Sequence, residues 1–598
     1  MTGKLLTVAT PEAGYTFVYD DGLGNTGQLQ TVAIGPDLMS AATSTLTYTY
    51  DGDLMTGESL TGDVTGSVTW GYDNQLRLDE ETAAADTVAY GYDTQGRLTT
   101  MGAMTATYVP TTGQLDTTTL TDVVASYSYD AFGDLAGILY EDGGAAVYEV
   151  VYTRDSYGRV ETKTETLDGS STLHCYEYDN ADRLADVYDA ADSLGCTGTN
   201  LESYSYDANG NRSVVTNSAG TIGVGGIVTD NQDRLLTHGD VTYAYNEDGQ
   251  LESRTDTPSG DVWLYTYDAL GNLLEVDPPG MTGTVTYTID PRNRRVGKSV
   301  GGVMVQQFLY GDQLNPVAEV DGTGALVSRF VYGSSDHVPD YMVRGGVTYR
   351  FLTDQLGSVV GVLNLTSGLL AQTREYDAYG RIVGGGTVEA GFSQPFGFAG
   401  GLYDEDTGLV RFGARDYRPE VGSWAAKDPL RFGAGDGLLY GYVLQDPVNA
   451  TDKSGEFPEP ARIWNAWKWF SPVGDGFKVW GQVYALAAIV SGGELGFDTE
   501  KLVFVVDRSP LVDWHMEGSD SGFTPNGDIV CLGTRASSDT YEHEYQHVRQ
   551  SDLFQNNVLY SFLHATAQLY SYVTTGSYHK GNWLEQGPYS SPSRPWPW

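Results

Sequence analysis

The segment from Tyr541 to His547 carries residue types that can do zinc chemistry. His543 and His547 are four residues apart, and Glu544 directly follows the first, which is an H-E-x-x-H pattern. On a helix, positions i and i+4 lie on one face, so both imidazoles can reach one Zn²⁺ ion. Glu544 is then placed to take a proton from a zinc-bound water. The pattern predicts a zinc metallopeptidase; the alternative is a helix with two surface histidines.

A zinc site of this kind needs a third protein ligand from downstream of the helix. Three residues qualify by type: His564, His579 and Glu585. A carboxylate beside Trp583 and Leu584 is costly to bury unless it meets a cation or a metal. Glu585 is therefore the preferred ligand and His564 the second choice. The plain alternative for Glu585 is a solvated loop carboxylate.

The composition predicts a β-rich chain of more than one domain. The 598 residues include 75 Gly and 42 Tyr, and this length exceeds one ordinary hydrophobic core. The formal net charge is −45 at pH 7, of which −38 falls before residue 456. Because an acidic surface repels phosphate, this charge argues against a nucleic-acid partner.

Cysteine usage and the N-terminal residues bear on where the chain works. Cys175, Cys196 and Cys531 do not make a disulfide scaffold, although a bridge between the first two stays open. The first 19 residues lack the charged start and apolar stretch of a secretory signal. The longest apolar run, 479–490, is too short to span a bilayer. We therefore expect secretion, delivery to target cells or cell-surface association without the usual N-terminal signal peptide.

A degenerate repeat fills residues 1 to about 380. Its unit reads aromatic-x-Tyr-Asp-x-x-Gly-Arg-Leu, and the clearest copies lie at 92–98 and 376–382. Alternating aromatics predict a half-buried strand, Asp-x-x-Gly predicts a turn in which Gly takes a positive φ, and Arg-Leu begins the return strand. We expect tyrosine faces and Asp–Arg contacts to form ladders across neighbouring repeats.

These repeats resemble the YD repeats of the Rhs family of polymorphic toxins. The repeat-associated core of that family is matched in segments 349–358, 374–380, 396–400, 408–411, 415–417, 427–429 and 446–447. The resemblance implies a mainly β fold, in which a hairpin spiral forms an open shell or collar around a variable C-terminal toxin. It divides the chain into a shell (1–348), a closing core (349–455) and a small α+β zincin-like domain (456–598).

Two aspartates mark the end of the shell in that family and act as an aspartic-protease-like pair that frees the toxin. The positions that match are Asp428 and Asp452, and two close carboxylates that share a proton can activate water. Lys453 and Glu456 depart from the family pattern, which has Pro after the second Asp and Leu after the next Gly. The alternative is that both aspartates are turn residues that close the shell.

The C-terminal segment resembles the zincin-type metallopeptidase toxins of polymorphic bacterial effectors. The matching residues are His543, Glu544, His547, Gln550, Asn582 and Glu585. The resemblance implies Zn²⁺ held by His543, His547 and Glu585, a protein substrate in the target cell and a cognate immunity protein. A turn followed by a strand, expected over 523–532, would pair with an extended substrate or is a plain core strand.

Ribbon geometry limits what the repeats can enclose. A domain of the 143 residues from 456 to 598 has a diameter of roughly 37 Å. About 38 strands at ~4.8 Å make a ribbon of roughly 180 Å, little more than one turn around such a domain. We therefore expect an open collar, or an assembly in which a second YD-repeat chain or a secretion apparatus covers the exposed sheet edge.

The predicted function is an Rhs-type toxin whose C-terminal domain is a zinc metalloendopeptidase, carried by a shell that self-cleaves near residue 456. A second interpretation is a surface module whose aromatic ladders hold glycans and whose C-terminus is catalytically inactive. A nuclease toxin is disfavoured by the acidic charge.

Overall fold

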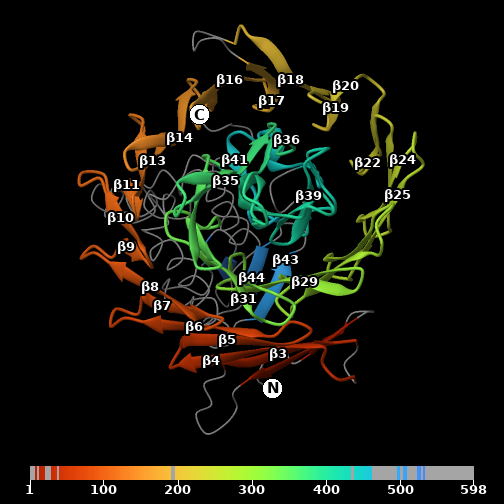
Figure 1. The fold of residues 1–598 in the computed structure, drawn as a ribbon. Helices are drawn as coiled ribbons and strands as arrows, with labels where there is room; N and C mark the ends of the chain where they lie inside the picture. The colour runs from red at the N-terminus through yellow and green to blue at the C-terminus, as the bar shows by residue number, and fades with distance from the viewer. Residues whose placement is uncertain are drawn as a thin grey trace, which may run out of the picture. The chain divides into compact units, whose positions relative to one another are not determined.

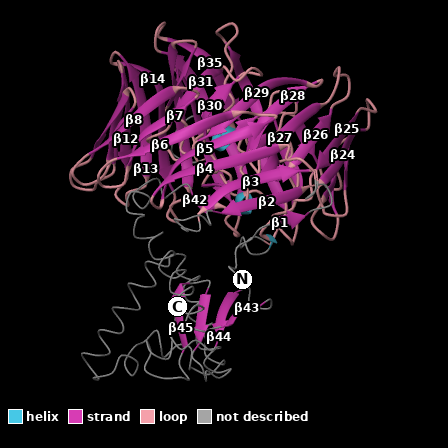
Figure 2. Ribbon diagram, turned by 90° about the horizontal axis from the view of Figure 1, so that it is seen from below, coloured by secondary structure: helices cyan, strands magenta, loops and turns pink. Residues whose placement is uncertain are grey.

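The computed structural model describes residues 7–9, 13–19, 28–36, 40–189, 196–431, 437–460, 494–498, 503–507, 522–526 and 529–532. The chain divides into two compact units, residues 1–464 and 465–598. In the first unit most described residues lie in antiparallel strands or in the turns between them (Figures 1 and 2), which confirms the predicted mainly β fold. Among the described residues, none forms a helix long and apolar enough to cross a membrane.

The first sheet has 20 strands, each antiparallel to the next along the chain. They are β1 (Thr7–Ala9), β2 (Gly14–Tyr19), β3 (Leu29–Gly35), β4 (Ser44–Asp51), β5 (Leu54–Gly62), β6 (Gly66–Tyr72), β7 (Leu78–Ala83), β8 (Asp86–Tyr92), β9 (Leu98–Met101), β10 (Met104–Tyr108), β11 (Leu115–Leu120), β12 (Val123–Tyr129), β13 (Leu135–Asp142), β14 (Ala145–Arg154), β15 (Val160–Leu167), β16 (Ser170–Tyr178), β17 (Leu184–Asp189), β18 (Thr199–Tyr206), β19 (Arg212–Asn217) and β20 (Gly220–Ile222).

The second sheet has 16 strands joined in the same way. They are β21 (Ile227–Thr229), β22 (Leu235–His238), β23 (Val241–Tyr245), β24 (Leu251–Asp256), β25 (Val262–Tyr267), β26 (Leu273–Asp277), β27 (Val285–Ile289), β28 (Arg295–Val300), β29 (Val303–Tyr310), β30 (Pro316–Val320), β31 (Leu326–Val331), β32 (Tyr341–Arg344), β33 (Val347–Thr353), β34 (Val359–Asn364), β35 (Leu369–Tyr376) and β36 (Ile382–Thr387).

The two strands of each repeat are joined by one turn, and residues of the repeat unit stabilise that turn. The carboxylate of Asp93 accepts hydrogen bonds from the backbone N–H of Gln95 and of Arg97, both at 2.9 Å. The Arg97 guanidinium pairs with the same carboxylate at 2.7 Å. Gly96 has a φ of +83°, where a side chain would be strained. The predicted Asp-x-x-Gly turn is therefore confirmed.

The ladder between repeats differs from the expected one. Most Asp–Arg pairs form within one repeat, four residues apart, as between Asp73 and Arg77. Arg159 also reaches Asp182 of the next repeat, at 2.7 Å. The link to the next repeat is made mainly by aromatic contacts: the Arg77 guanidinium covers the Tyr92 ring at 4.3 Å, and the Tyr92 hydroxyl donates to the Leu78 carbonyl at 2.8 Å. Equivalent bonds to backbone carbonyls come from Tyr50, Tyr72, Tyr108, Tyr129, Tyr178, Tyr206, Tyr310, Tyr332 and Tyr376.

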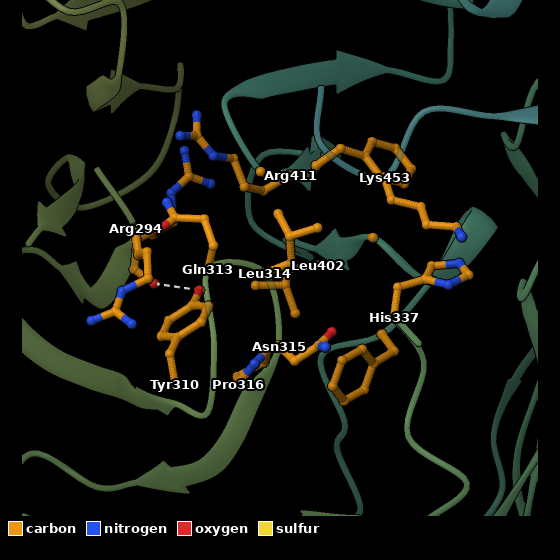
Figure 3. A pocket seen from close by; sticks show the side chains of 16 residues that line it. Arg294, Tyr310, Gln313, Leu314, Asn315, Pro316, His337, Leu402, Arg411 and Lys453 are labelled. Atoms are coloured by element: carbon orange, nitrogen blue, oxygen red, sulfur yellow. Dashed lines mark hydrogen bonds between the residues drawn. The ribbon is translucent and has the colours of Figure 1, made fainter. Parts of the chain in front are cut away.

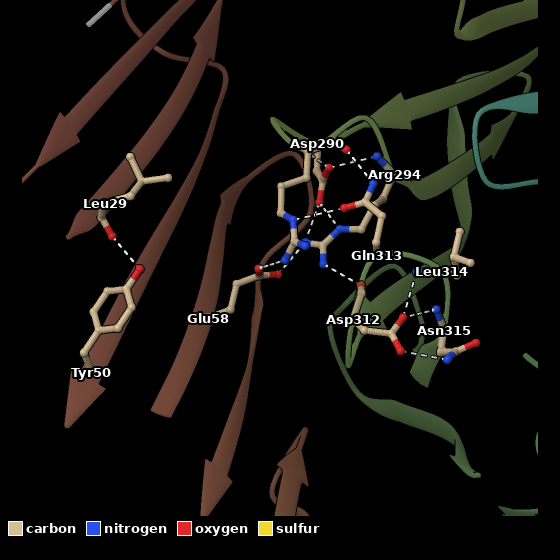
Figure 4. A network of polar contacts seen from close by, with 10 residues as sticks. Leu29, Tyr50, Glu58, Asp290, Arg294, Asp312, Gln313, Leu314 and Asn315 are labelled. Atoms are coloured by element: carbon tan, nitrogen blue, oxygen red, sulfur yellow. Dashed lines mark hydrogen bonds and ion pairs between the residues drawn. The ribbon is translucent and has the colours of Figure 1, made fainter. Parts of the chain in front are cut away.

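The array winds past its own beginning. The Arg294 guanidinium, directly before β28, donates to the Glu58 carboxylate of β5, 236 residues away in sequence (Figure 4). Arg329 of β31 meets Glu81 of β7 at 2.8 Å across 248 residues. We call β1–β27 the first circuit and β28–β36 the second circuit. The repeats therefore complete one circuit, and the strands of the second circuit pack against those of the first.

The two circuits share apolar side chains as well as ion pairs. One buried cluster joins residues of the first circuit (Val32, Leu46, Leu60 and Val64) with residues of the second (Val296, Phe308, Phe330, Met342 and Phe351). Each fully buried side chain of this size contributes about 1.5–3 kcal/mol. The overlap is thus a hydrophobic core of its own.

The second circuit follows a shorter path than the first. The separation between contacting residues falls from 248 at Glu81 and Arg329 to 173 at Tyr206 and Tyr379. Over this arc the first circuit supplies β7 to β18 and the second only β31 to β35. Because strands are evenly spaced, the second circuit has the smaller radius, and Figure 1 shows it inside the first.

The rest of the core is a set of short elements packed against both circuits. They are η1 (Phe398–Gly400), β37 (Leu402–Tyr403), β38 (Val410–Phe412), β39 (Arg415–Arg418), β40 (Ser423–Trp424), η3 (Val443–Gln445), β41 (Ala450–Thr451) and β42 (Glu459–Pro460). Aromatic rings of Phe398, Phe412, Tyr417, Trp424 and Tyr442 form their shared centre. Side chains from this segment bond to distant strands, as Asn449 does to the Val160 N–H.

A disulfide joins Cys175 of β16 to Cys196, a pairing that the sequence left open. The bond spans 21 residues, and a loop of this length is worth about 3 kcal/mol through its constraint on the unfolded chain.

In the second unit the described residues form one four-stranded sheet in the order β43-β44-β46-β45. Its strands are β43 (Glu494–Asp498), β44 (Val503–Asp507), β45 (Gly522–Asn526) and β46 (Ile529–Leu532). The expected strand is present as β46, whereas residues 523–526, expected as part of a turn, belong to β45. The helix predicted around residues 541–547 lies outside the described residues.

Candidate functional site at the end of the core

Three short elements bring one arginine and two aspartates together. Arg415 begins β39, Asp428 follows β40, and Asp452 follows β41. Arg415 Nη2 lies 2.8 Å from Asp428 Oδ2 and 3.1 Å from Asp452 Oδ2. All three side chains are buried, and the Trp424 ring covers the guanidinium at 4.1 Å. One cation therefore pairs with two carboxylates from separate elements.

The second carboxylate also holds the chain that leaves the core. Asp452 Oδ1 accepts hydrogen bonds from the backbone N–H of Glu456 at 3.0 Å and of Phe457 at 3.1 Å. The Ser454 hydroxyl donates to the same oxygen at 3.2 Å. The segment 452–457, which we call the exit segment, is thus folded back on its own first residue.

Gly455 fits a position in the exit segment that other residues would strain. Its φ is +67°, and a Cβ there would lie 2.4 Å from the Phe412 carbonyl oxygen. Its own carbonyl accepts a hydrogen bond from Arg415 Nε. The same arginine therefore ties down both the carboxylates and the backbone of the exit segment.

Electrostatics at this site follow from burial. Burial raises the pKa of Asp428, and the Arg415 charge opposes that shift. Burial, followed by the charges of Asp428 and Asp452, raises the pKa of Glu456. Burial also lowers the pKa of Arg415. Such an ion-pair group is sensitive to the loss of either partner, because the remaining charge would be buried alone.

The predicted aspartic-type autoprotease is corrected by this geometry. The structure does bring Asp428 and Asp452 together, but both face the Arg415 guanidinium. An aspartic peptidase needs two carboxylates that share a proton and hold a water, whereas here a single guanidinium nitrogen, Arg415 Nη2, contacts both carboxylates. The alternative stated from the sequence, two aspartates that close the shell, fits these contacts.

The predicted zinc residues lie outside the described residues. They are His543, Glu544 and His547, with Glu585 as third ligand and His564 as its alternative. Zn²⁺ binding by them stays a prediction. Within the described ranges, no group of three or more His, Cys, Asp or Glu side chains is placed to hold a metal ion.

Arg411 and Arg415 lie in segments that match the family core, but their buried ion pairs were not predicted from the sequence. Arg411, Arg415 and Arg418 fall three to four residues apart in a segment that is otherwise largely apolar or aromatic. Arginine is almost never fully buried unless it is paired, so this spacing could have indicated buried ion pairs. It could not have named their partners, which come from other parts of the chain.

Comparison with known proteins places the repeats in a described group. A family model described as Teneurin YD-shell matches residues 1–433. Teneurin-3 from Mus musculus is 28% identical over 430 residues, which is 69% of this chain and 15% of that protein. A crystal structure of TcdB2-TccC3 has a TM-score of 0.57 and 18% identity, and the match covers 76% of this chain and 28% of that chain. This structural likeness shows the fold.

A bacterial relative has a named activity. The tRNA3(Ser)-specific nuclease WapA from Bacillus spizizenii is 30% identical over 269 residues, which is 44% of this chain and 11% of that protein. The chain thus spans no more than 15% of the length of the curated relatives named here.

The WapA relatives overturn the predicted zinc metalloendopeptidase. WapA is named a tRNA nuclease in Bacillus subtilis also, so both of these bacterial relatives are named nucleases and neither is named a peptidase. The charge argument against nucleic acid fails for a physical reason. It rested mainly on the shell, because −38 of the −45 falls before residue 456, and a shell's charge does not decide what a separate segment binds.

Proposed function

Because the chain belongs to the Teneurin YD-shell family, we propose that residues 1–455 are a carrier shell for a toxin or effector segment that begins near residue 456. The observation that carries this proposal is the anchored exit segment. Asp452 and Arg415 hold it through two backbone N–H groups and one carbonyl, at the point where the core ends.

A carrier of this kind needs a rigid boundary between shell and cargo. The buried ion pairs of Arg415 supply one, since they join β39, the segment after β40 and the segment after β41. Lys453 adds a further contact, because its Nζ lies 3.0 Å from Asp336, which precedes β32 of the second circuit. The exit segment is therefore fastened both to the core and to the array.

The relatives support the toxin class without fixing its chemistry. WapA is a tRNA nuclease, and the TcdB2-TccC3 fold is shared over 76% of this chain. The cargo would act on a factor in a target cell, and a cognate immunity protein would protect the producing cell. A second YD-repeat chain or a secretion apparatus would complete the shell. Such a protein works outside the producing cell or at its surface.

The glycan-binding alternative requires exposed aromatic ladders. The repeat tyrosines do not supply them, because their hydroxyls donate to backbone carbonyls and arginines cover several of the rings. Tyr178 is an example: its hydroxyl donates to the Val160 carbonyl at 2.7 Å, and the Arg159 guanidinium lies 4.4 Å from its ring centre.

Inducible expression in a susceptible bacterial host tests the proposal. The full chain is expected to arrest growth, whereas a chain that stops after residue 455 is expected to be harmless at equal abundance. Total RNA and new protein N-termini from the arrested cells then identify the class of target. Normal growth with the full chain at high abundance would overturn the toxin proposal.

A further inference from the structure

A pocket partly open to solvent lies between the second circuit and the core (Figure 3). Its lining includes Arg294, Arg295, Arg411, Lys453 and His337. None of the lining residues in the described part of the chain is Asp or Glu. In a chain of net charge −45, a pocket lined by cations is the reverse of the general surface.

Two of these cations share a single carboxylate. Arg295 Nη2 lies 2.9 and 3.0 Å from the two oxygens of Asp416, and Arg411 Nη1 lies 3.0 Å from one of them. The side chains of Arg295 and Arg411 are only 7% and 3% exposed. By direct contacts, this group therefore holds two positive charges and one negative charge, and an excess buried charge is unfavourable without a further anion.

By contrast, each neighbouring cation contacts two carboxylates, one more than its own charge requires. Arg294 contacts both Asp290 and Glu58, and Lys453 contacts Asp336 and Glu459. The excess charge thus belongs to the Arg295 and Arg411 pair and is not a general property of the wall.

Each member of the pair also keeps one unused donor. The Nε atoms of Arg295 and Arg411 are buried, and neither has a hydrogen-bond partner in the part of the chain that the structure describes. These two N–H groups, one on each guanidinium, equal in number the two oxygens of a carboxylate. Burial, and then the charge of Arg295, also lower the pKa of Arg411, although Asp416 opposes them; a bound anion would relieve both effects.

The rest of the wall indicates what the anion is attached to. Apolar side chains of Leu314, Pro316, Phe396, Leu402 and Phe412 line the same pocket. A strongly hydrated phosphate would lose its water against such a wall, whereas an apolar body would be buried favourably.

We propose that this pocket binds a carboxylate carried on an apolar body. The carboxylate can come from a free organic acid or from a glutamate side chain of a peptide, and the chemistry of recognition is the same. The site is independent of the proposed carrier function, because it needs only the second circuit and the core.

Thermal unfolding of the full chain, titrated with three probes at equal ionic strength, tests the proposal. Phenylacetate and N-acetylglutamate amide are expected to raise Tm in a saturable way, and inorganic phosphate is not. A stronger response to phenylacetate assigns the site to a free acid, and a stronger response to the glutamate derivative assigns it to a peptide. No saturable response to either carboxylate, or an equal response to phosphate, would overturn the proposal.

Two variants locate the response. Arg411→Gln is expected to abolish it. Since that variant can fail to fold, Leu314→Glu offers a second route: it places a carboxylate on the pocket wall and is expected to raise Tm without ligand and to remove the response. Leu270→Glu, in an exposed turn of another repeat, is the matched control and should keep the response. A wild-type response in Leu314→Glu would place binding elsewhere and refute the site.

Discussion

At the scale of single residues, Arg415 decides whether the end of the core holds together. Its guanidinium serves two buried carboxylates and the Gly455 carbonyl. Replacement by Gln would leave Asp428 and Asp452 close together without a counter-ion. We expect Arg415→Gln to lower the free energy of unfolding by about 3–5 kcal/mol at pH 7, measured by urea denaturation.

The pH dependence of that loss has a definite sign. Arg415 opposes the raised pKa of Asp428, so without it this carboxyl takes up a proton more easily as the pH falls. The loss of unfolding free energy therefore shrinks towards pH 4. Arg254→Gln is the control, because its pair with Glu420 is more exposed and is worth about 0–1 kcal/mol. A loss of that size in Arg415→Gln would contradict the assigned role.

Leu76 occupies a turn position where the repeat usually has Gly. Its φ is +63°, a left-handed conformation that strains a residue with a Cβ, and its side chain is 66% exposed. Leu76→Gly should therefore raise the free energy of unfolding by about 1 kcal/mol. The matched change is Gly96→Leu, at the equivalent position of the next repeat, which should lower it by about 1–2 kcal/mol. Chemical denaturation of both variants checks this; equal signs would argue against turn strain as the cause.

Glu202 predicts a pH-dependent contact between the two circuits. Its carboxylate in β18 accepts hydrogen bonds from the Ala378 N–H at 3.2 and 3.3 Å. Burial and then the charge of Asp377 raise its pKa from 4.5 to about 7. A raised pKa means that the folded state binds the proton more tightly than the unfolded state. The contribution of Glu202 to stability is therefore complete below pH 4.5 and is lost as the pH rises through about 7.

Glu202→Gln removes this titration because it imitates the protonated acid. At pH 8 the variant should be more stable than the wild type by up to about 3 kcal/mol, and near pH 4.5 the two should be similar. Denaturation midpoints across pH 4.5–8 measure the effect, with the exposed Glu161→Gln as control. Parallel curves for the wild type and Glu202→Gln would rule the contact out as a pH-sensitive junction.

At the scale of elements, the hairpins could be predicted because their chemistry is local. Tyr92, Asp93, Gly96 and Arg97 contain the aromatic, the carboxylate, the glycine and the cation that the turn uses. All of these contacts lie within one repeat or reach the next. The predicted Asp–Arg ladder across repeats forms at few positions, such as Arg159 and Asp182, because in most repeats the turn brings the arginine back to its own aspartate.

At the scale of the whole molecule, the overlap of the two circuits is directly testable. Arg329 and Glu81 are buried and meet across 248 residues. A double-mutant cycle with Arg329→Met and Glu81→Gln should give a coupling energy of about 1–3 kcal/mol. The same cycle for Arg77 and Asp73, which lie in one turn and are partly exposed, should give less. Zero coupling between Arg329 and Glu81 would mean that the circuits do not pack as described.

The candidate site and the pocket could not be predicted for the same physical reason. Asp416 is reached by Arg295 from a strand more than a hundred residues earlier, and Glu202 meets the backbone beside Asp377. Such pairings depend on the curvature of the sheet, which is the sum of many small twists between strands. Asp428 and Asp452 could be named from a motif, but Arg415 between them required the folded core.

The overlap also restricts how the chain can change in length. Contacts between the circuits have a fixed register. Arg294 meets Glu58 only because a circuit of 236 residues separates them. Loss of one hairpin from the first circuit would shift every later contact between the circuits by one hairpin. Buried cations such as Arg329 would then face apolar strands. Single repeats can therefore be gained or lost freely only outside the region where the two circuits contact each other. Within that region, the contacts fix the number of repeats in one circuit.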